Sequence, residues 1–182
     1  MQAILERPWL LPALLATTGL SALGLALMAQ YWGGLQPCVL CIYQRYAHGA
    51  AGGAGLLALA LAARHAGQYA AARQLLTGLT GFGGLALLAG AAIAAFHVGV
   101  ERHWWRGTGG CHAPGFDADL TIDELREAML GTRFVPCDEI PWELFGISMA
   151  GYNFLFSLAL GVAVLWMLVR LRAGRAGMGV PA

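Results

Sequence analysis

Long apolar segments separated by shorter polar ones dominate the chain. Three stretches of more than twenty residues contain no Asp, Glu, Lys or Arg, and a fourth contains a single Arg. An α-helix rises about 1.5 Å per residue, so about 20 residues cross a hydrocarbon core of roughly 30 Å. The pattern predicts an all-α fold, a four-transmembrane-helix bundle forming a single membrane domain, with spans at about residues 9–30, 38–63, 74–96 and 145–169.

Composition supports this class and excludes others. Hydrophobic residues make up 58% of the 182 residues and charged residues 12%, against about 25% charged in an average soluble domain. A formal net charge of +1 without a basic cluster argues against nucleic-acid binding. The first apolar run, Trp9 to Gln30, is too long for the apolar region of a signal peptide, so we expect it to remain as a span.

The arginines between the spans predict the orientation. Cytoplasmic loops of membrane proteins carry an excess of basic residues. The N-terminal stub, the connection between the second and third spans and the tail at 170–182 would share one side, and they contain Arg7, Arg64, Arg73, Arg170, Arg172 and Arg175. We therefore expect both termini in the cytoplasm, and the segments at about 31–37 and 98–144 outside it.

The longer outer loop contains a helix signal. Residues Thr121 to Glu124 match a capping box, in which a Thr hydroxyl and a Glu carboxylate satisfy the first free amides of a helix. Ile122, Leu125 and Met129 then share one face. This predicts a short amphipathic helix, which lies either in the membrane interface or against its own loop.

Small residues on the second span predict helix packing. Lipid offers no hydrophobic drive for helices to associate, so membrane helices approach one another through small side chains. Gly49 and Gly53 are spaced four residues apart, which places them on one helix face. We expect this face to contact a neighbouring helix.

The four cysteines all fall on the predicted outer side. Cys38 and Cys41 lie where the first outer loop enters the second span, and Cys111 and Cys137 lie in the second outer loop. This distribution indicates thiol and disulfide chemistry in an oxidising compartment. The alternative is a pair of structural disulfides, which suits Cys111 and Cys137 well. A bridge between Cys38 and Cys41 would close a very small loop and stabilise little, whereas a C-x-x-C pair is typical of redox-active dithiols.

Two neighbours of Cys41 favour a thiolate. Pro37 suits a helix start, which would place Cys41 in the first turn, near free amides and the positive end of the helix dipole. Arg45 lies one turn deeper on the same face, and a charge inside a span indicates function by default. The alternative is an arginine that extends to the lipid headgroups.

Two further interpretations stay open at this point. A zinc site could be built from Cys38, Cys41, Cys111 and Cys137 with His112, although Arg45 would oppose the cation. The chain could also be a non-enzymatic four-helix scaffold or a transporter with structural disulfides. Cys41 is followed by Ile42, so the haem-attachment pattern C-x-x-C-H is not met.

The segment Gln36 to Tyr46, QPCVLCIYQRY, resembles the signature of the DsbB family. The resemblance extends to the four spans, to the two outer cysteine pairs, and to Phe134-Val135-Pro136-Cys137 with Trp142, Gly146 and Ser148 before the last span. It implies a multi-pass protein of the bacterial inner membrane, a protein-disulfide:quinone oxidoreductase. Such a protein reoxidises a periplasmic DsbA-like thioredoxin-fold partner and passes the electrons to ubiquinone or menaquinone.

The resemblance also implies roles for individual residues. The partner would attack the Cys111–Cys137 disulfide at Cys111, the freed Cys137 would attack Cys38, and Cys41 would leave as a thiolate next to the quinone. Arg45 and Cys41 would bind the cofactor, and no metal is expected. His97, Glu101 and His103 are candidate quinone contacts, with an ordinary solvated loop as the alternative for each.

Overall fold

A computed structural model describes residues 9–65, 69–111 and 135–176. Its long helices are α2 (Leu10–Tyr31), α3 (Val39–Arg64), α4 (Tyr69–Glu101) and α6 (Met149–Ala176). All four are long and apolar enough to cross a membrane, which confirms the predicted four-helix fold class. The amphipathic helix expected after Thr121 lies outside the described residues.

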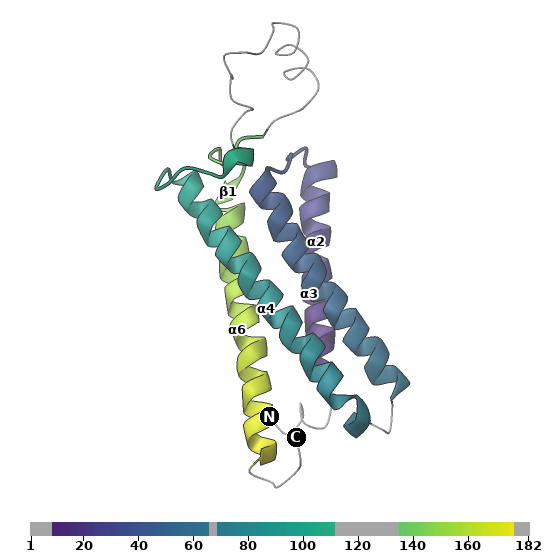
Figure 1. The fold of residues 1–182 in the computed structure, drawn as a ribbon. Helices are drawn as coiled ribbons and strands as arrows, with labels where there is room; N and C mark the ends of the chain where they lie inside the picture. Colours follow the sequence, from purple (N-terminus) through teal and green to yellow (C-terminus); the bar gives the residue numbers. More distant parts are fainter. Residues whose placement is uncertain (1–8, 66–68, 112–134, 177–182) are drawn as a thin grey trace, which may run out of the picture.

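The helices form a bundle in which neighbours along the chain also pack together (Figure 1). Helix α3 packs against α2 and α4, and α4 packs against α6. The start of α3, the end of α4 and the start of α6 meet at one end of the bundle (Figure 1). A 3-10 turn, η1 (Gly109–Cys111), and an antiparallel pair of short strands, β1 (Glu143–Leu144) and β2 (Ile147–Ser148), lie at the same end. We call it the cysteine end, because all four cysteines are there.

Helix α4 continues past the predicted end of the third span at Phe96. It runs to Glu101, and the chain turns only at His103, which has a φ of 58°. His97 and Glu101 are four residues apart, so they lie on one face of the last turn. Both are buried, at 4% and 6% exposure. The solvated-loop alternative is therefore wrong for these two residues, because the polar positions point into the bundle.

The last span begins later than the sequence pattern indicates. Phe145 and Gly146, with φ values of 53° and 75°, form the turn between β1 and β2, and the Phe145 side chain is 91% exposed. The Ser148 hydroxyl accepts a hydrogen bond from the Gly151 amide at 3.1 Å, which is the contact of a helix N-cap. The apolar run from Phe145 therefore divides into a hairpin and a helix.

The glycines at the α2–α3 contact are not the pair that the spacing suggested. A Cβ atom on Gly49 or Gly53 would meet no atom within 4 Å, so the prediction that they make the contact is wrong. On Gly55 it would lie 2.5 Å from the Ala16 nitrogen, and on Gly19 it would lie 2.8 Å from the Gly52 nitrogen. The two backbones approach through these other glycines.

Alanine substitutions separate the two glycine sets. Gly55→Ala forces a methyl group against the α2 backbone, and such overpacking costs about 1–3 kcal/mol, so we expect a lower midpoint of thermal unfolding in detergent. Gly53→Ala is the matched control, because its Cβ meets open space, and we expect no loss. Equal midpoints for the two variants would contradict the assigned helix contact.

Candidate active site

Cys111 and Cys137 form a disulfide at the cysteine end, with Cα atoms 5.1 Å apart. The η1 turn holds Cys111, whose amide donates to the Thr108 carbonyl at 2.7 Å. Gly107 packs closely against Cys111, because a Cβ atom on Gly107 would lie 2.5 Å from the Cys111 Cβ. Cys111 is 3% exposed and Cys137 is fully buried. The disulfide therefore lies inside the protein.

Cys38 and Cys41 sit at the N-terminus of α3 as thiols, with their sulfur atoms 3.0 Å apart. Cys38 is the N-cap residue, and its Sγ accepts a hydrogen bond from the Cys41 amide at 3.3 Å. Cys41 lies in the first turn, as expected, but its backbone amide donates to the sulfur of Cys38. The helix start therefore favours a thiolate on Cys38, which corrects the expectation that placed it on Cys41.

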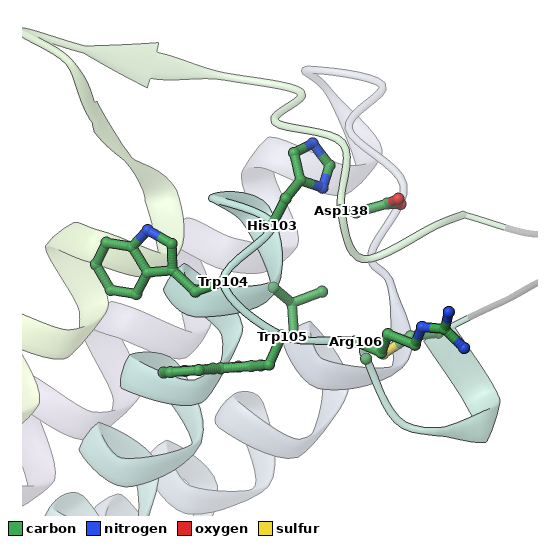
Figure 2. Close-up of a pocket in the computed structure, with 8 residues that line it drawn as sticks. His103, Trp104, Trp105, Arg106 and Asp138 are labelled. Atoms are coloured by element: carbon green, nitrogen blue, oxygen red, sulfur yellow. The ribbon is translucent and has the colours of Figure 1, made fainter.

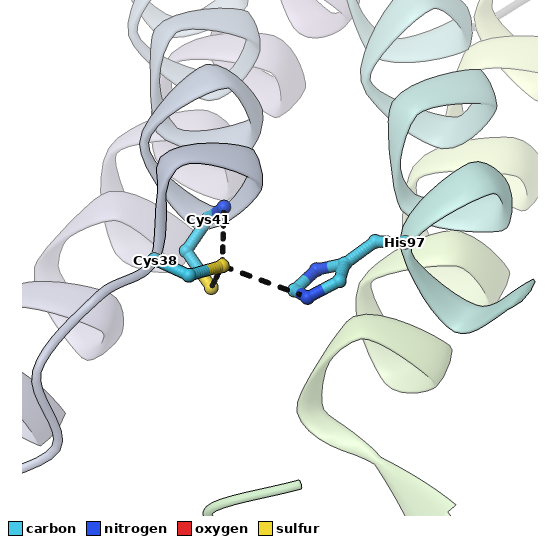
Figure 3. Close-up of side chains that lie close together, drawn as sticks. All are labelled: Cys38, Cys41 and His97. Atoms are coloured by element: carbon cyan, nitrogen blue, oxygen red, sulfur yellow. Dashed lines mark hydrogen bonds between the residues drawn. The ribbon is translucent and has the colours of Figure 1, made fainter. Parts of the chain in front are cut away.

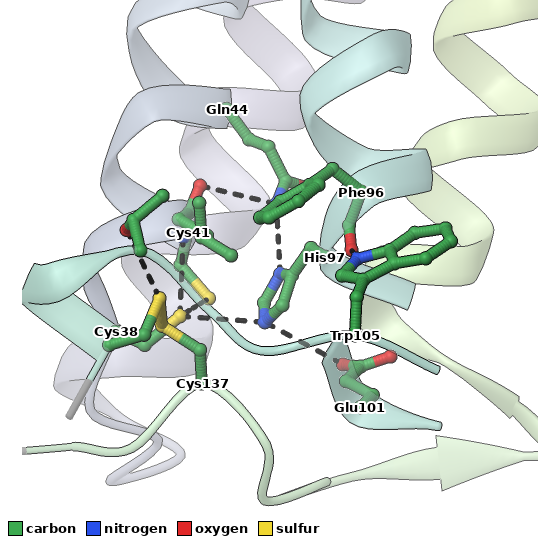
Figure 4. The surroundings of a disulfide bond; sticks show 11 residues. Cys38, Cys41, Gln44, Phe96, His97, Glu101, Trp105 and Cys137 are labelled. Atoms are coloured by element: carbon green, nitrogen blue, oxygen red, sulfur yellow. Dashed lines mark hydrogen bonds and ion pairs between the residues drawn. A yellow bond between two sulfur atoms is a disulfide. The ribbon is translucent and has the colours of Figure 1, made fainter. Parts of the chain in front are cut away.

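The two cysteine pairs belong to one buried cluster. Cys38, Cys111 and Cys137 pack with Leu40 and Val100, and Cys41 is among the half-buried residues around them. Figure 4 shows Cys137 beside the Cys38–Cys41 pair. Residues separated by about a hundred positions in the sequence thus share a site from which water is largely excluded.

The disulfide also bears on the zinc alternative. Cys111 and Cys137 are bonded to each other, so they supply no thiolate ligands, and the four-cysteine site of this alternative is not formed. His112 lies outside the described residues. Cys38, Cys41 and His97 keep their potential ligand atoms within 4.8 Å of one another.

His97 comes from α4 and faces the thiol pair (Figure 3). Its Nε2 lies 3.6 Å from the Cys38 sulfur and 3.9 Å from a carboxylate oxygen of Glu101. The other oxygen of Glu101 accepts a hydrogen bond from the Ser148 hydroxyl. His97 and Glu101 thus join the thiols to the start of α6.

These contacts set the protonation of Cys38, which precedes the membrane-spanning part of α3. The hydrogen bond with Cys41 lowers the pKa of the Cys38 thiol most, and His97 lowers it further. Burial acts in the opposite direction, but the net pKa stays below the ordinary value. Cys38 is the sulfur that carries negative charge most readily in the reduced pair.

Arg45 is half-buried one turn below Cys41, and it faces α2. Its guanidinium donates to the side-chain oxygen of Gln30 and to the carbonyl of Ala26, the latter at 3.2 Å. The guanidinium lies one helical turn from Cys41 along α3. The structure therefore anchors this arginine within the bundle.

A cavity of about 300 Å³ lies next to the disulfide. Figure 2 shows that Trp104, Trp105, Arg106 and Asp138 line it together with His103, and Cys111 forms part of its wall. His103 is exposed, so the solvated-loop interpretation suits it. Trp105 is held in place by a hydrogen bond to the Phe96 carbonyl at 3.0 Å.

The model of the family "Disulfide bond formation protein DsbB" matches residues 7–167. The chain belongs to the DsbB family. It is similar to the disulfide bond formation protein B of Azoarcus sp. (strain BH72), with 31% identity over 90% of this chain and 92% of the relative. The protein of the same name from Polaromonas sp. (strain JS666) is 32% identical over 88% of this chain and 89% of its own. No solved structure matches the chain significantly.

Membership of the DsbB family identifies a multi-pass membrane protein of disulfide formation, a disulfide-forming oxidoreductase. The sequence interpretation missed several polar residues around its thiols. Gln44 contacts His97, and Asn153 contacts Gln44. The available signal was the presence of amide side chains inside apolar spans, where polar groups are costly and indicate function.

Replacing His97 tests its effect on the thiol pair. The background is the Cys111→Ser, Cys137→Ser double variant, in which ultraviolet absorbance follows the formation of the Cys38 thiolate as the pH rises. We expect His97→Ala to move this titration to higher pH. A hydrogen bond to a charged group contributes about 1.5–3 kcal/mol, which corresponds to roughly one to two pH units. The exposed His103→Ala is the control, and we expect it to leave the curve in place. A coincident titration of His97→Ala and the parent would contradict the assigned contact.

Proposed function

We propose that this protein reoxidises a DsbA-like thioredoxin-fold thiol oxidase of the periplasm and passes the electrons to a membrane quinone. One observation carries the proposal. Cys38, Cys111 and Cys137 pack in a single buried cluster, with Cys41 at its edge and His97 facing Cys38. Two purely structural disulfides have no need to share one site with a buried histidine and carboxylate.

The exchange proceeds through four disulfide steps. A thiolate of the reduced partner attacks Cys111, forming a bond between the two proteins and releasing Cys137 as a thiolate. The partner's second thiol then attacks its own bonded cysteine, which leaves the partner oxidised and Cys111 and Cys137 reduced. Cys137 next attacks Cys38 of an oxidised Cys38–Cys41 pair, and Cys41 leaves as a thiolate. Attack of Cys111 on Cys137 restores the Cys111–Cys137 disulfide and frees the thiol of Cys38.

The last two exchanges move two electrons from the Cys111–Cys137 pair to the Cys38–Cys41 pair, and the surroundings of the leaving sulfur atoms favour this transfer. Thiol exchange is fastest when the leaving sulfur is a stable thiolate. While Cys38 is bonded to Cys137, Cys41 is the remaining thiol of the pair, one helical turn from the Arg45 guanidinium. Once Cys38 is free, its hydrogen bonds from the Cys41 amide and His97 stabilise its negative charge.

The first step needs movement at the cysteine end. Cys111 is buried, so a partner thiolate cannot reach its sulfur in the conformation described here. The cavity lined by Trp104, Arg106 and Asp138 borders the disulfide, because Cys111 forms part of its wall. We propose that the partner opens the site from this cavity by displacing the turn that holds Cys111.

The residues around Cys41 fit a quinone chemically. A bound quinone supplies an acceptor for two electrons and two protons. Cys41 and Arg45 are half-buried. A guanidinium has five N–H donors, and one on Nη1 and one on Nη2 are bonded to Gln30 and Ala26. Arg45 would hold a carbonyl oxygen of the cofactor, and His97 and Glu101 would border it from α4. We propose ubiquinone or menaquinone, because a site at the end of four apolar spans would be open to a lipid-soluble quinone.

The proposed location follows from the same arrangement. Disulfide exchange needs the cysteine end on the oxidising side of a membrane. The opposite end of the bundle carries Arg64 and Arg170, as the excess of basic residues at the cytoplasmic side requires. We therefore propose the bacterial inner membrane, with both termini in the cytoplasm.

Two cysteine variants separate this function from a structural role. With purified protein, quinone and a reduced thioredoxin-fold partner, we expect Cys41→Ser to abolish quinone reduction. We expect Cys111→Ser to abolish the disulfide-linked adduct with the partner, as seen by non-reducing electrophoresis. Full turnover in either variant would contradict the cysteine roles. No turnover in the parent, with only a lower abundance of the variants, would instead support a scaffold with structural disulfides.

Arg45→Lys tests the proposed quinone contact. A lysine keeps the charge but loses the fork of donors that holds Gln30 and Ala26, so we expect a roughly tenfold higher KM for quinone, equivalent to about 1.4 kcal/mol. Formation of the partner adduct should be unchanged. Arg170→Lys, at the other end of the bundle, is the control. An unaltered KM in Arg45→Lys would leave Arg45 as a structural anchor only.

A further inference from the structure

A chain of polar side chains crosses the interior of the bundle below the thiols. Helices α3, α4 and α6 all contribute to it, and hydrogen bonds connect its members in sequence. Its members, of which four are buried and Asn153 is half-buried, are Gln44, His48, His97, Asn153 and Ser157. Inside a membrane bundle such groups must satisfy one another, so the direction of each hydrogen bond can be worked out from the chemistry of its donors.

The contact between Gln44 and His97 fixes the tautomer of the histidine. The Gln44 Nε2 lies 3.0 Å from the His97 Nδ1. An amide nitrogen only donates, so Nδ1 must accept and carries no proton. The proton of the neutral ring therefore sits on Nε2, the nitrogen that faces the Cys38 sulfur at 3.6 Å (Figure 4).

The backbone decides which way the Gln44 amide points. Its Nε2 also donates to the Leu40 carbonyl at 3.2 Å. Turning the amide over would bring its oxygen against this carbonyl oxygen and leave two acceptors facing each other. The contact of the Gln44 oxygen supports the same orientation, because this oxygen accepts a hydrogen bond from the amide nitrogen of Asn153.

The far end of the chain supports the same direction. The Asn153 oxygen accepts from the Ser157 hydroxyl at 2.9 Å and lies 2.7 Å from the His48 Nε2, which must therefore be the donor. The chain ends at the His48 Nδ1, which is buried and has no hydrogen-bond partner among the described residues. The hydrogen bonds that join these five side chains to one another therefore all run in one direction, towards Cys38.

We propose that Gln44 is a positioning residue that holds His97 as the Nε2–H tautomer, so that His97 donates a hydrogen bond to the Cys38 sulfur instead of removing its proton. Asn153 supports Gln44 by occupying its oxygen. The catalytic consequence rests on the proposed function, because it concerns the thiolate that forms when Cys38 is released. The tautomer itself is a property of the resting protein.

Nitrogen NMR of protein labelled with 15N-histidine reads this tautomer directly. The sample holds neither partner nor quinone, and the His97 signals are assigned by their loss in His97→Phe. In the parent we expect an unprotonated Nδ1 and a protonated Nε2. In Gln44→Glu the side chain offers acceptors to both Asn153 and His97, so we expect the His97 Nδ1 signal to move to the protonated region.

Two further variants complete the test. Ser157→Ala removes a hydroxyl at the far end of the chain and leaves Gln44 bonded to Leu40, so we expect the spectrum of the parent. If Gln44→Glu does not fold, Gln44→Met removes the donor, and the His97 Nδ1 signal should lose its hydrogen-bonded shift. A protonated Nδ1 in the parent, or an unchanged signal in both Gln44 variants, would overturn the role of Gln44. Absence of quinone-dependent turnover in the parent would contradict only the proposed function.

Discussion

The absence of water from the hydrocarbon core governs how this bundle is built. A polar group there costs several kcal/mol unless another protein group pairs with it. Arg45 is tied to α2 through Gln30 and Ala26, and the amide of Gln44 uses both its nitrogen and its oxygen within the bundle. These contacts hold the helices in register as well as satisfying polar groups, since each joins two different helices.

The same constraint gives the thiols their chemistry. In a site of low polarity a hydrogen bond to a charged group is stronger than in water, so the Cys41 amide and His97 act strongly on the Cys38 sulfur. The disulfide is buried against the same residues. The proposed transfer of electrons between the two cysteine pairs requires that they lie close together and that other thiols are kept out, and the closed cluster at the cysteine end meets both requirements.

Much of the fold was predictable from general rules for membrane proteins. The thickness of the membrane sets the length of a span, and the difference between its two sides biases where basic residues fall. The sequence also singled out the cysteine pairs and Arg45 as candidate site residues, since few residue types carry this chemistry. The extension of α4 to Glu101 was not, because His97 and Glu101 look like loop residues until their partners are known. Nor was the hairpin at Phe145, whose apolar residues match a span while the turn depends on local backbone geometry.

Helix contacts escaped prediction for a related reason. Spacing shows which glycines share a face, but only the crossing of two helices decides which face is used, so Gly55 makes the contact and Gly53 does not. The partners of Gln44 depend in the same way on α4 and α6, which are distant in the sequence. Several faces of a helix can look equally suitable in the local sequence, and only the packing of the whole bundle decides which one makes the contact.

The closeness of the two cysteine pairs is the central claim, and a double variant tests it most directly. Cys41→Ser with Cys111→Ser leaves Cys38 and Cys137 as the two cysteines, and peptide mapping by mass spectrometry without reductant reports their state after mild oxidation. The cluster described here predicts a nearly complete disulfide between Cys38 and Cys137 within one molecule. Two free thiols, or bonds formed only between molecules, would contradict it.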